Sequence, residues 1–369
     1  LHRTILWTTA AAIFAMAGCS VQESQPRAVV RDAERYELPG VHKPDRTSVY
    51  VDCNNAAHWD GDTMYVFSSA GRPWRTHGPD LFNLSRPSVV TSYDNNKDAQ
   101  GRPYNGGRWI ESTYKAPDGN LYGWYHREPG GICPNTRLTA PQVGAVVSTD
   151  NGLNWRDLGI VLKAPEDSLF CETPNKYFAG GNGDFSVILD NHKKYFYFFI
   201  STYNNDVKEQ GVSIARMAYA DRDDPVGKVF KWHNRSWNEP GIGGHVTPIF
   251  PAAVTWHEPV VDAFWGASVH WNTHLKQYVI LLNRAIDKNW AQEGVYVTFN
   301  PDLARPDGWS EPVKILDAAQ LEASKWYPQV IGINAQARET DKLAGRVARL
   351  LVAGISKWEV VFLKPGEEL

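Results

Sequence analysis

Two carboxylates stand at the same distance from an aromatic residue in two stretches of the chain. Glu111 lies eleven residues before Tyr122, and Asp184 lies eleven residues before Tyr195. In the second stretch the acid opens an alternating apolar run, a polar turn follows, and an aromatic run returns. This layout is typical of a β-hairpin, with the acid at the mouth of its first strand.

The same spacing recurs twice with other residues in the first position. Ala267 lies eleven residues before Tyr278, and Asn54 lies eleven residues before Tyr65. In the copy nearest the N-terminus a further acid, Asp52, lies two residues upstream of Asn54. The spacing therefore predicts four hairpins of one kind.

Further strands follow these hairpins in a constant order. The segments 211–215 and 294–298 each begin sixteen residues after the returning aromatic residue, and 230–232 and 309–315 are expected outer strands. A more degenerate fifth copy covers 326–362. Repeats of roughly 50 to 80 residues with about four short strands each are typical of a propeller. The sequence thus predicts an all-β chain folded as a five-bladed β-propeller.

In a propeller the first strand of each blade lines the central channel, so residues at matching positions meet there. We therefore expect Asp52, Glu111 and Asp184 to share one pocket. Such a group suits glycoside hydrolysis, in which one acid protonates the leaving oxygen and another activates water or attacks the anomeric carbon. A third acid can tune the pKa of its neighbours. Glu258 is a fourth catalytic candidate, whereas the alternative is that these acids only cap turns or pair with nearby arginines.

Other side chains near the same pocket are candidates for binding a substrate. They are Asn54, Trp265, His270, Arg284 and Tyr327. His270 could equally be a packed strand residue, and Arg284 could be a solvated charge rather than a contact for an anionic substrate. No cofactor is expected to be required, and no residue is assigned to a metal, although a structural calcium ion could occupy the central channel.

The composition and charge of the chain limit the kinds of molecule that it is expected to bind. The net charge is −3 and no long basic run is present, which argues against nucleic acid. The chain has no Gly-rich phosphate loop, zinc-binding helix motif or nucleophile elbow. Aromatic residues make up 12% of it, enough to supply both a core and rings that stack on sugars. We therefore expect a glycan as the partner, and a monomer.

The first residues resemble a targeting sequence. Residues 1–19 combine a basic start, an apolar run and a small-residue exit, which is typical of a secretory signal. The ending Met16-Ala17-Gly18-Cys19 resembles a bacterial lipobox, whose cysteine would be lipidated; an ordinary signal peptide is the alternative. The expected division is a signal at 1–19, a flexible tether at 20–47 and the propeller at 48–369. The protein would then be held at the cell envelope by its lipid alone.

Three cysteines remain after such processing. Cys133 and Cys171 both lie in loops that precede the central hairpin. Outside the cytoplasm a disulfide between them is allowed, and the sequence leaves open whether it forms. If it does, Cys53 stays free and buried.

One segment resembles a known propeller motif. Residues 148–155 read Ser-Thr-Asp-Asn-Gly-Leu-Asn-Trp, similar to the Asp-box of sialidases, Ser-x-Asp-x-Gly-x-Thr-Trp, with Asn154 in place of Thr. In this motif the Asp accepts bonds from turn N–H groups, the Gly takes a positive φ and the Trp packs between blades. Because the motif lies on outer strands, Asp150 is expected to be structural.

The five repeats together resemble five-bladed glycosidases of the family 43 type, the arabinanase and β-xylosidase relatives, over about residues 48–365. The resemblance implies an inverting glycosidase in which Asp52 is the base and Asp184 modulates a neighbouring pKa. Blade four reads Trp265-Gly266-Ala267-Ser268 where that family has a Glu-Gly-Pro step. Glu111 is therefore the preferred acid, with Glu258 second. The rival interpretation is a non-catalytic propeller that binds carbohydrate.

Overall fold

The computed structural model describes residues 25–39, 41, 51–85, 107–321 and 325–369, together with the backbone of two short strands at 88–89 and 92–93. The expected signal sequence and Cys19 lie outside the described residues. Within the described part of the chain, no helix is long and apolar enough to cross a membrane.

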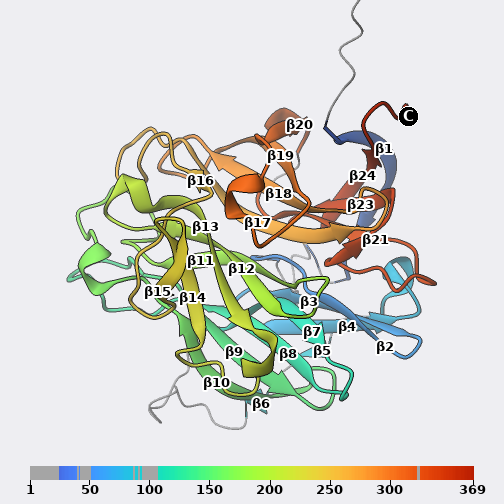
Figure 1. The fold of residues 1–369 in the computed structure, drawn as a ribbon, viewed down its shortest axis with the longest axis horizontal. Coiled ribbons are helices and arrows are strands. Elements are labelled where there is room, and N and C mark those ends of the chain that lie inside the picture. Colours follow the sequence, from blue (N-terminus) through green and yellow to red (C-terminus); the bar gives the residue numbers. More distant parts are fainter. Residues whose placement is uncertain are drawn as a thin grey trace, which may run out of the picture.

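The residues that the structure describes form five mainly antiparallel sheets, which are arranged as the blades of a β-propeller (Figure 1). Blade one contains β2 (Ala57–Asp60), β3 (Thr63–Ser69), β4 (Pro73–Gly78) and β5 (Ser88–Val89). Blade two contains β7 (Trp109–Lys115), β8 (Leu121–Arg127), β9 (Gln142–Ser148) and β10 (Asn154–Leu162), with β6 (Ser92–Tyr93) added in parallel to β10. The predicted fold class is confirmed.

The other three blades complete the ring. Blade three contains β11 (Asn182–Leu189), β12 (Tyr195–Tyr203), β13 (Gln210–Ala218), β14 (Val229–His233) and β15 (Ser236–Pro240), with β16 (Phe250–Pro251) paired to β13. Blade four contains β17 (Ala263–Asn272), β18 (Gln277–Ala285), β19 (Gln292–Asn300) and β20 (Val313–Asp317), with β22 (Leu343–Ala344) paired to β17. Blade five contains β21 (Pro328–Gly332), β23 (Val347–Val352), β24 (Ile355–Leu363) and β1 (Arg27–Glu37).

Within the described ranges, six single-turn 3₁₀ helices occupy connections between these strands. They are η1 (Leu81–Asn83), η2 (Glu166–Ser168), η3 (Val207–Glu209), η4 (Tyr219–Asp221), η5 (Pro306–Gly308) and η6 (Ala318–Gln320).

The core lies between neighbouring blades, and this explains the apolar runs of the inner strands. Phe185 and Val187 of β11 pack against Trp124 of β8, and Phe196 of β12 joins the same cluster. All four side chains are almost completely buried. Burying one such side chain stabilises a fold by about 1.5–3 kcal/mol. Both faces of these sheets meet another blade, so the strands are apolar along most of their length.

β1 forms the outer strand of the last blade, which differs from the tether expected over 20–47. It pairs antiparallel with β24, beside it in Figure 1. Ala28 and Val30 pack against the cluster that contains Trp358 and Phe362. The sequence of β1 is mostly polar because one face of an outermost strand meets solvent, and this polarity resembles that of a linker. The segment therefore covers an edge of the sheet that would otherwise be open.

The first copy of the repeat also differs in detail from its prediction. Within the described residues, 51–56 is not a strand, and β2 begins only at Ala57. The Asn55 amide N–H donates to Gln329 Oε1 at 2.5 Å, and the Asn55 side chain donates to the Phe67 carbonyl at 3.1 Å. Together with backbone bonds from the Asp52 N–H to the Ser69 carbonyl and from the Phe67 N–H to the Ala56 carbonyl, they hold this segment against β3 and β21. The acid Asp52 thus lies on a channel segment and not on a strand.

The segment that resembles an Asp-box forms the turn between β9 and β10. Asp150 Oδ1 accepts hydrogen bonds from the Asn154 amide at 2.9 Å and from the Ser148 hydroxyl at 2.8 Å. Gly152 has φ +79°, and a Cβ at this position would lie 2.5 Å from the Phe67 ring. Trp155 is completely buried against Phe67 of blade one. The turn therefore joins two blades, and Asp150 has only structural contacts.

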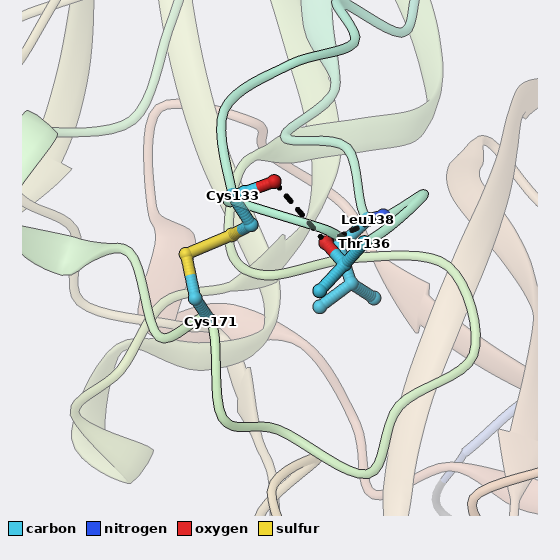
Figure 2. Close-up of a disulfide and its surroundings, with 4 residues drawn as sticks. All are labelled: Cys133, Thr136, Leu138 and Cys171. Carbon is cyan, nitrogen blue, oxygen red and sulfur yellow. Dashed lines mark hydrogen bonds between the residues drawn. A yellow bond between two sulfur atoms is a disulfide. The ribbon is translucent and has the colours of Figure 1, made fainter.

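A disulfide connects Cys133 and Cys171, the pairing that the sequence left open (Figure 2). The first cysteine lies in the loop between β8 and β9, and the second lies in the long connection between β10 and β11. Leu138 and Ala179 pack beside them. Cys53 is free and buried. The bond holds together two loops that would otherwise be linked mainly by the bridge between Thr139 and Phe178.

Candidate active site

β-Bulges interrupt the first strands of three blades at the positions matched in the sequence. The register shifts between Ile110 and Ser112 in β7, between Gly183 and Phe185 in β11, and between Trp265 and Ser268 in β17. The residues skipped by these ladders include Glu111, Asp184 and Ala267. A bulge leaves its extra residue unpaired and redirects its side chain. The eleven-residue spacing therefore marked the points where each inner strand releases a residue to the channel.

The acids released by blades two and three share one buried network with a histidine of β8. Glu111 Oε2 accepts the Phe185 amide hydrogen at 2.7 Å, and Glu111 Oε1 lies 3.4 Å from His126 Nδ1. That nitrogen is also 3.2 Å from the amide nitrogen of Asp184. Asp184 Oδ2 accepts the hydroxyl hydrogen of Tyr203 at 2.7 Å. Predicted acids 73 positions apart in the sequence are thus brought together.

A further acid, Glu128, extends the network to the rim. Glu128 Oε1 lies 3.1 Å from His126 Nε2, so His126 stands between Glu128 and Glu111. The Glu128 side chain is 33% exposed, whereas Glu111 and His126 are almost fully buried. Glu128 is therefore the most exposed member of this chain of contacts.

Asp52 reaches the same pocket from blade one. Its Oδ2 accepts a hydrogen bond from Trp109 Nε1 at 3.2 Å, and the residue remains open to the cavity. Partial removal from water raises the pKa of Asp52 to about 6, and the charge of Asp184 adds to this effect. The carboxyl can therefore change its protonation state near neutral pH.

The buried members of the network hold their protons more tightly than usual. Burial raises the pKa of Glu111 to about 8, with His126 opposing the shift. Burial also raises the pKa of Asp184, against the effects of His126 and Tyr203. For His126 burial alone would lower the pKa, but the hydrogen bond to Glu128 and the charges of Asp184 and Glu111 raise it to about 9. The pKa values of all three groups are thus displaced by burial and by one another, and such shifts mark functional-site candidates.

Aromatic rings enclose these acids in a cavity of about 200 Å³. The walls are formed by Trp109, Tyr177, Phe178, Trp265, Trp290, Trp326 and Tyr327, while Asp52, His126, Glu128 and Asp184 supply the polar groups. Tyr177 and Phe178 belong to the connection fixed by Cys171. A small cavity with several stacking surfaces and a few polar groups is the usual form of a ligand site.

Three residues of this cavity have left-handed backbone conformations. Asp184, Trp290 and Tyr327 have φ values of 40°, 64° and 59°. For residues other than glycine this conformation costs about 1–2 kcal/mol each. Strain of this kind persists where the surrounding structure enforces it, often at functional sites. Its concentration here supports the assignment of the cavity as the functional site.

The other predicted site residues lie elsewhere. Glu258 is exposed on the connection between β16 and β17 and does not line the cavity. Arg284 forms a two-pronged ion pair with Asp262, at 2.7 and 2.9 Å, away from the cavity lining. His270 is completely buried in β17, and burial lowers its pKa to about 3. The cavity therefore receives no contact from these three residues.

Asn54 and Glu111 lie beneath the cavity lining. The Asn54 side chain donates to the carbonyl oxygens of Phe185 and Ala267, at 3.2 and 3.1 Å. It thereby links the bulges of blades three and four. Of the predicted substrate-binding residues, Trp265 and Tyr327 do line the cavity.

Sequence reasoning missed His126, Glu128, Trp109 and Trp290. His126 and Glu128 come from the returning strand of blade two and the loop after it, whereas the positions matched by the repeat lie on first strands. An acid two residues beyond a histidine at the end of a predicted strand was the signal available. Trp290 lies on the β18–β19 connection, and nothing in its local sequence indicates that it returns to the axis.

The buried cluster also has the composition of a potential metal site. Glu111, His126 and Asp184 offer ligand atoms within 4.8 Å of one another. Calcium prefers six to eight oxygen ligands, whereas this set combines two carboxyl groups with an imidazole. Each of the three side chains already has protein hydrogen-bond partners. The set fits calcium poorly, and a calcium ion elsewhere in the channel stays a prediction.

Solved structures with the same fold include glycosidases. The chain is similar to an exo-1,5-α-L-arabinanase from a bovine ruminal metagenomic library, at 12% identity and a TM-score of 0.51 over 86% of this chain and 93% of that one. It is also similar to a GH43 β-1,3-galactosidase, at 12% identity and a TM-score of 0.50 over 90% of this chain and 60% of that one. No family model and no curated protein sequence matches the chain. At these identities the likeness establishes the five-bladed propeller fold.

Proposed function

We propose that this protein is a glycoside hydrolase that acts in the cavity at the propeller axis. The observation that carries the proposal is the meeting of Asp52, Asp184 and Glu128 inside a wall of aromatic rings. Glycoside hydrolysis needs two carboxyl groups in different protonation states. Aromatic rings suit the apolar faces of sugar rings.

The roles follow from access to the cavity. Asp52, which is open to the cavity, is the proposed base that activates water. Asp184 is nearly buried beside it and raises the pKa of Asp52 through its charge. Glu128 is the proposed proton donor, because Glu111 does not reach the cavity lining and Glu258 lies outside it. The proton that it delivers is the one shared with His126 Nε2, 3.1 Å from Glu128 Oε1. This assignment replaces Glu111 as the preferred acid.

The cavity size favours a single sugar residue. Its volume of about 200 Å³ is below the ~300–1,000 Å³ of typical ligand sites. We therefore propose that the terminal residue of a glycan enters the cavity. An inverting outcome, as implied by the family resemblance, is part of the proposal and is read from the anomer that is first released, by NMR.

The test is release of reducing sugar from a broad glycan panel by the chain from residue 25 onward. Asp52→Asn, Asp184→Asn and Glu128→Gln should each lower release by ~10²-fold or more while the fold is retained. Glu258→Gln is the matched control and should retain full activity. Equal activity of all four variants would overturn the assignment of the acids.

A carbohydrate-binding propeller without activity is the second candidate. The observation that favours it is the blade-four segment Trp265-Gly266-Ala267, which supplies a ring and no carboxylate to the channel. Under this alternative some glycan of the panel binds without being cut, and Asp52→Asn binds it as well as the parent protein does. Trp265→Ala would weaken binding under both candidates and does not distinguish them.

Attachment to the cell envelope through Cys19 is a further part of the proposal and rests on the lipobox-like residues 16–19. Metabolic labelling with a fatty acid should mark the parent protein and not Cys19→Ala. If Cys19→Ala is labelled as strongly as the parent protein, Cys19 is not the site of lipid attachment.

A further inference from the structure

A second cavity lies at the opposite end of the inner strands from the candidate active site. In β7, Trp109 lines the first cavity, and Thr113, Tyr114 and Lys115 line the second. Lys115 follows Trp109 by six positions along the strand, which corresponds to about 20 Å. The second cavity has a volume of about 490 Å³. The two cavities therefore open on different faces of the propeller.

Half-buried aromatic rings line this second cavity. Trp59 of β2, Tyr114 of β7 and Trp271 of β17 come from three different blades, and each keeps part of its surface accessible. Trp59 is held in place from two sides. Its Nε1 donates to the Glu339 carbonyl at 2.8 Å, and the Arg338 guanidinium lies 4.7 Å from the ring centroid. Fixed rings of this kind lose little entropy when a ligand stacks on them.

Several buried polar groups of the lining lack a protein partner in the described part of the chain, among them those of Thr113 and Trp124. Thr113 Oγ1 and Trp124 Nε1 have no hydrogen-bond partner within the described residues, although Thr113 and Trp124 are 5% and 2% exposed. Both residues line the cavity. Leaving such a group unpaired costs about 1–3 kcal/mol. A ligand hydroxyl that enters between the lining side chains would satisfy either group.

The charges around the cavity are balanced. Lys115 pairs with Asp60 at 3.2 Å, Lys342 pairs with Asp341 at 3.0 Å, and Arg338 pairs with Asp62. Lys193 and Asp190 add one charge of each sign to the lining. Cations neutralised in this way give little attraction to an anion but still offer N–H donors. The electrostatics therefore favour a neutral, hydroxyl-rich ligand over an acidic one.

From these observations we propose that the second cavity is a binding site for a neutral saccharide, separate from the site of hydrolysis. Rings from three blades would stack on sugar faces, and the unpaired Thr113 and Trp124 groups would bond sugar hydroxyls. The site needs no catalysis and does not depend on the glycosidase proposal. If both proposals hold, one glycan chain can be retained on one face of the propeller while chain ends are cut on the other.

The test measures binding of neutral oligosaccharides by calorimetry in an Asp52→Asn background, which prevents turnover at the first cavity. The probes are linear oligomers of arabinose, xylose, galactose and glucose with three to six residues. Thr113→Val removes only the unpaired hydroxyl, so it should leave thermal stability unchanged or raised while weakening binding about 3- to 10-fold. Trp59→Ala should weaken binding about tenfold or more.

Phe230→Ala is the matched control, because Phe230 is a 43% exposed ring of β14 outside both cavities. Oligosaccharide binding that is unchanged in Trp59→Ala and in Thr113→Val would overturn the second site and leave the glycosidase proposal standing. If the parent protein has been shown to cleave glycans, the absence of any oligosaccharide binding by Asp52→Asn would also overturn the second site. If oligogalacturonate, an acidic saccharide, binds more tightly than every neutral probe and Trp59→Ala removes this binding, the proposal that the ligand is neutral is wrong.

Discussion

Neighbouring acids of the candidate site differ most in their access to water. Asp52 is open to the cavity, whereas Glu111 is 1% exposed and bonded to the Phe185 amide. Both pKa values are raised, but only Asp52 can exchange a proton with a ligand or with water in the cavity. Access therefore separates a group that can act on a substrate from one that organises the network beneath it.

At the residue scale, replacing Asp52 should remove activity and reveal its protonation state. Because the pKa of Asp52 is about 6, a base at this position is ionised above that pH and protonated below it. The kcat/KM of the parent protein should thus fall as the pH drops below about 6. Asp52→Asn should lose ~10³-fold in activity at pH 7, and its residual activity should lack this acid limb. A pH–rate series on the best glycan of the panel checks both outcomes.

Replacing Glu111 should change stability more than activity. A carboxyl whose pKa is about 8 in the folded protein and about 4.3 when unfolded makes the folded state lose stability as pH rises between these values. Glu111→Gln lacks this group, so its stability relative to the parent should increase from pH 5 to pH 9. Urea unfolding at pH 5, 7 and 9 measures the difference. Its activity at pH 7 should stay within about tenfold of the parent, since Glu111 is protonated there; a loss like that of Asp52→Asn would restore Glu111 as the acid.

At the scale of elements, the bulges of β7, β11 and β17 leave residues of the inner strands unpaired at the channel, where the candidate site lies. Each releases a residue from its ladder, and the freed backbone groups bond to the next blade. The Phe185 amide, beside the bulge of β11, reaches Glu111 of blade two, and the Gly266 amide reaches Ser201 of blade three at 2.8 Å. The same irregularities that carry the acids therefore also join the blades around the channel.

The disulfide should stabilise both the fold and one wall of the cavity. Cys133 and Cys171 are 38 residues apart, and closing a loop of that length contributes about 4 kcal/mol through the unfolded state. Cys133→Ser and Cys171→Ser should each lower the unfolding midpoint. They should also raise KM more than they lower kcat, because Tyr177 and Phe178 lie on the connection that is released. Thermal unfolding and kinetics under non-reducing conditions measure these effects.

The two serine variants and their double mutant should be equally destabilised, because any one of them removes the whole bond. Reduction of the parent protein with dithiothreitol should reproduce the shift and should leave each variant unchanged. Additive losses in the double mutant would contradict the account.

At the scale of the whole molecule, β1 closes the ring by completing blade five from the other end of the chain. A chain that begins at residue 38 lacks this strand and exposes the edge of β24 together with the apolar surface that Ala28 and Val30 cover. Compared with the chain from residue 25, it should unfold at a lower denaturant concentration and aggregate more readily. Denaturant unfolding and light scattering check the outcome.

Two point variants distinguish how much the packing of β1 contributes to stability from how much its ion pairs contribute. Val30→Asp should reproduce part of the destabilisation, whereas Arg31→Ala should cost less than about 1 kcal/mol, because the Arg31–Glu359 pair is largely solvated. Equal stability of the chains that begin at 25 and at 38 would show that β1 is dispensable.

The sequence by itself determined the blade count and the inner strands of blades two to five. The eleven-residue spacing reflects strand length and turn length, which are local properties, so it identified β7, β11 and β17 and the released positions Glu111 and Asp184. The polar composition of residues 27–37 predicted a tether where β1 lies. The prediction was wrong because an outermost strand that is exposed on one face has the composition of a linker. Local patterns carry no information about a partner more than 300 positions away.

Only the tertiary structure decided which of these residues a ligand can reach. Asp52 and Asp184 line the cavity, but Glu111 lies beneath it, and Glu128 and Trp290 enter from a loop and a later connection. Side chains at matching strand positions differ in depth, because each blade tilts and bulges differently around the axis. Loop residues approach the axis by paths that depend on every intervening contact. The local sequence thus specified the strands and their chemistry, and the packing of the five blades selected the residues that meet a substrate.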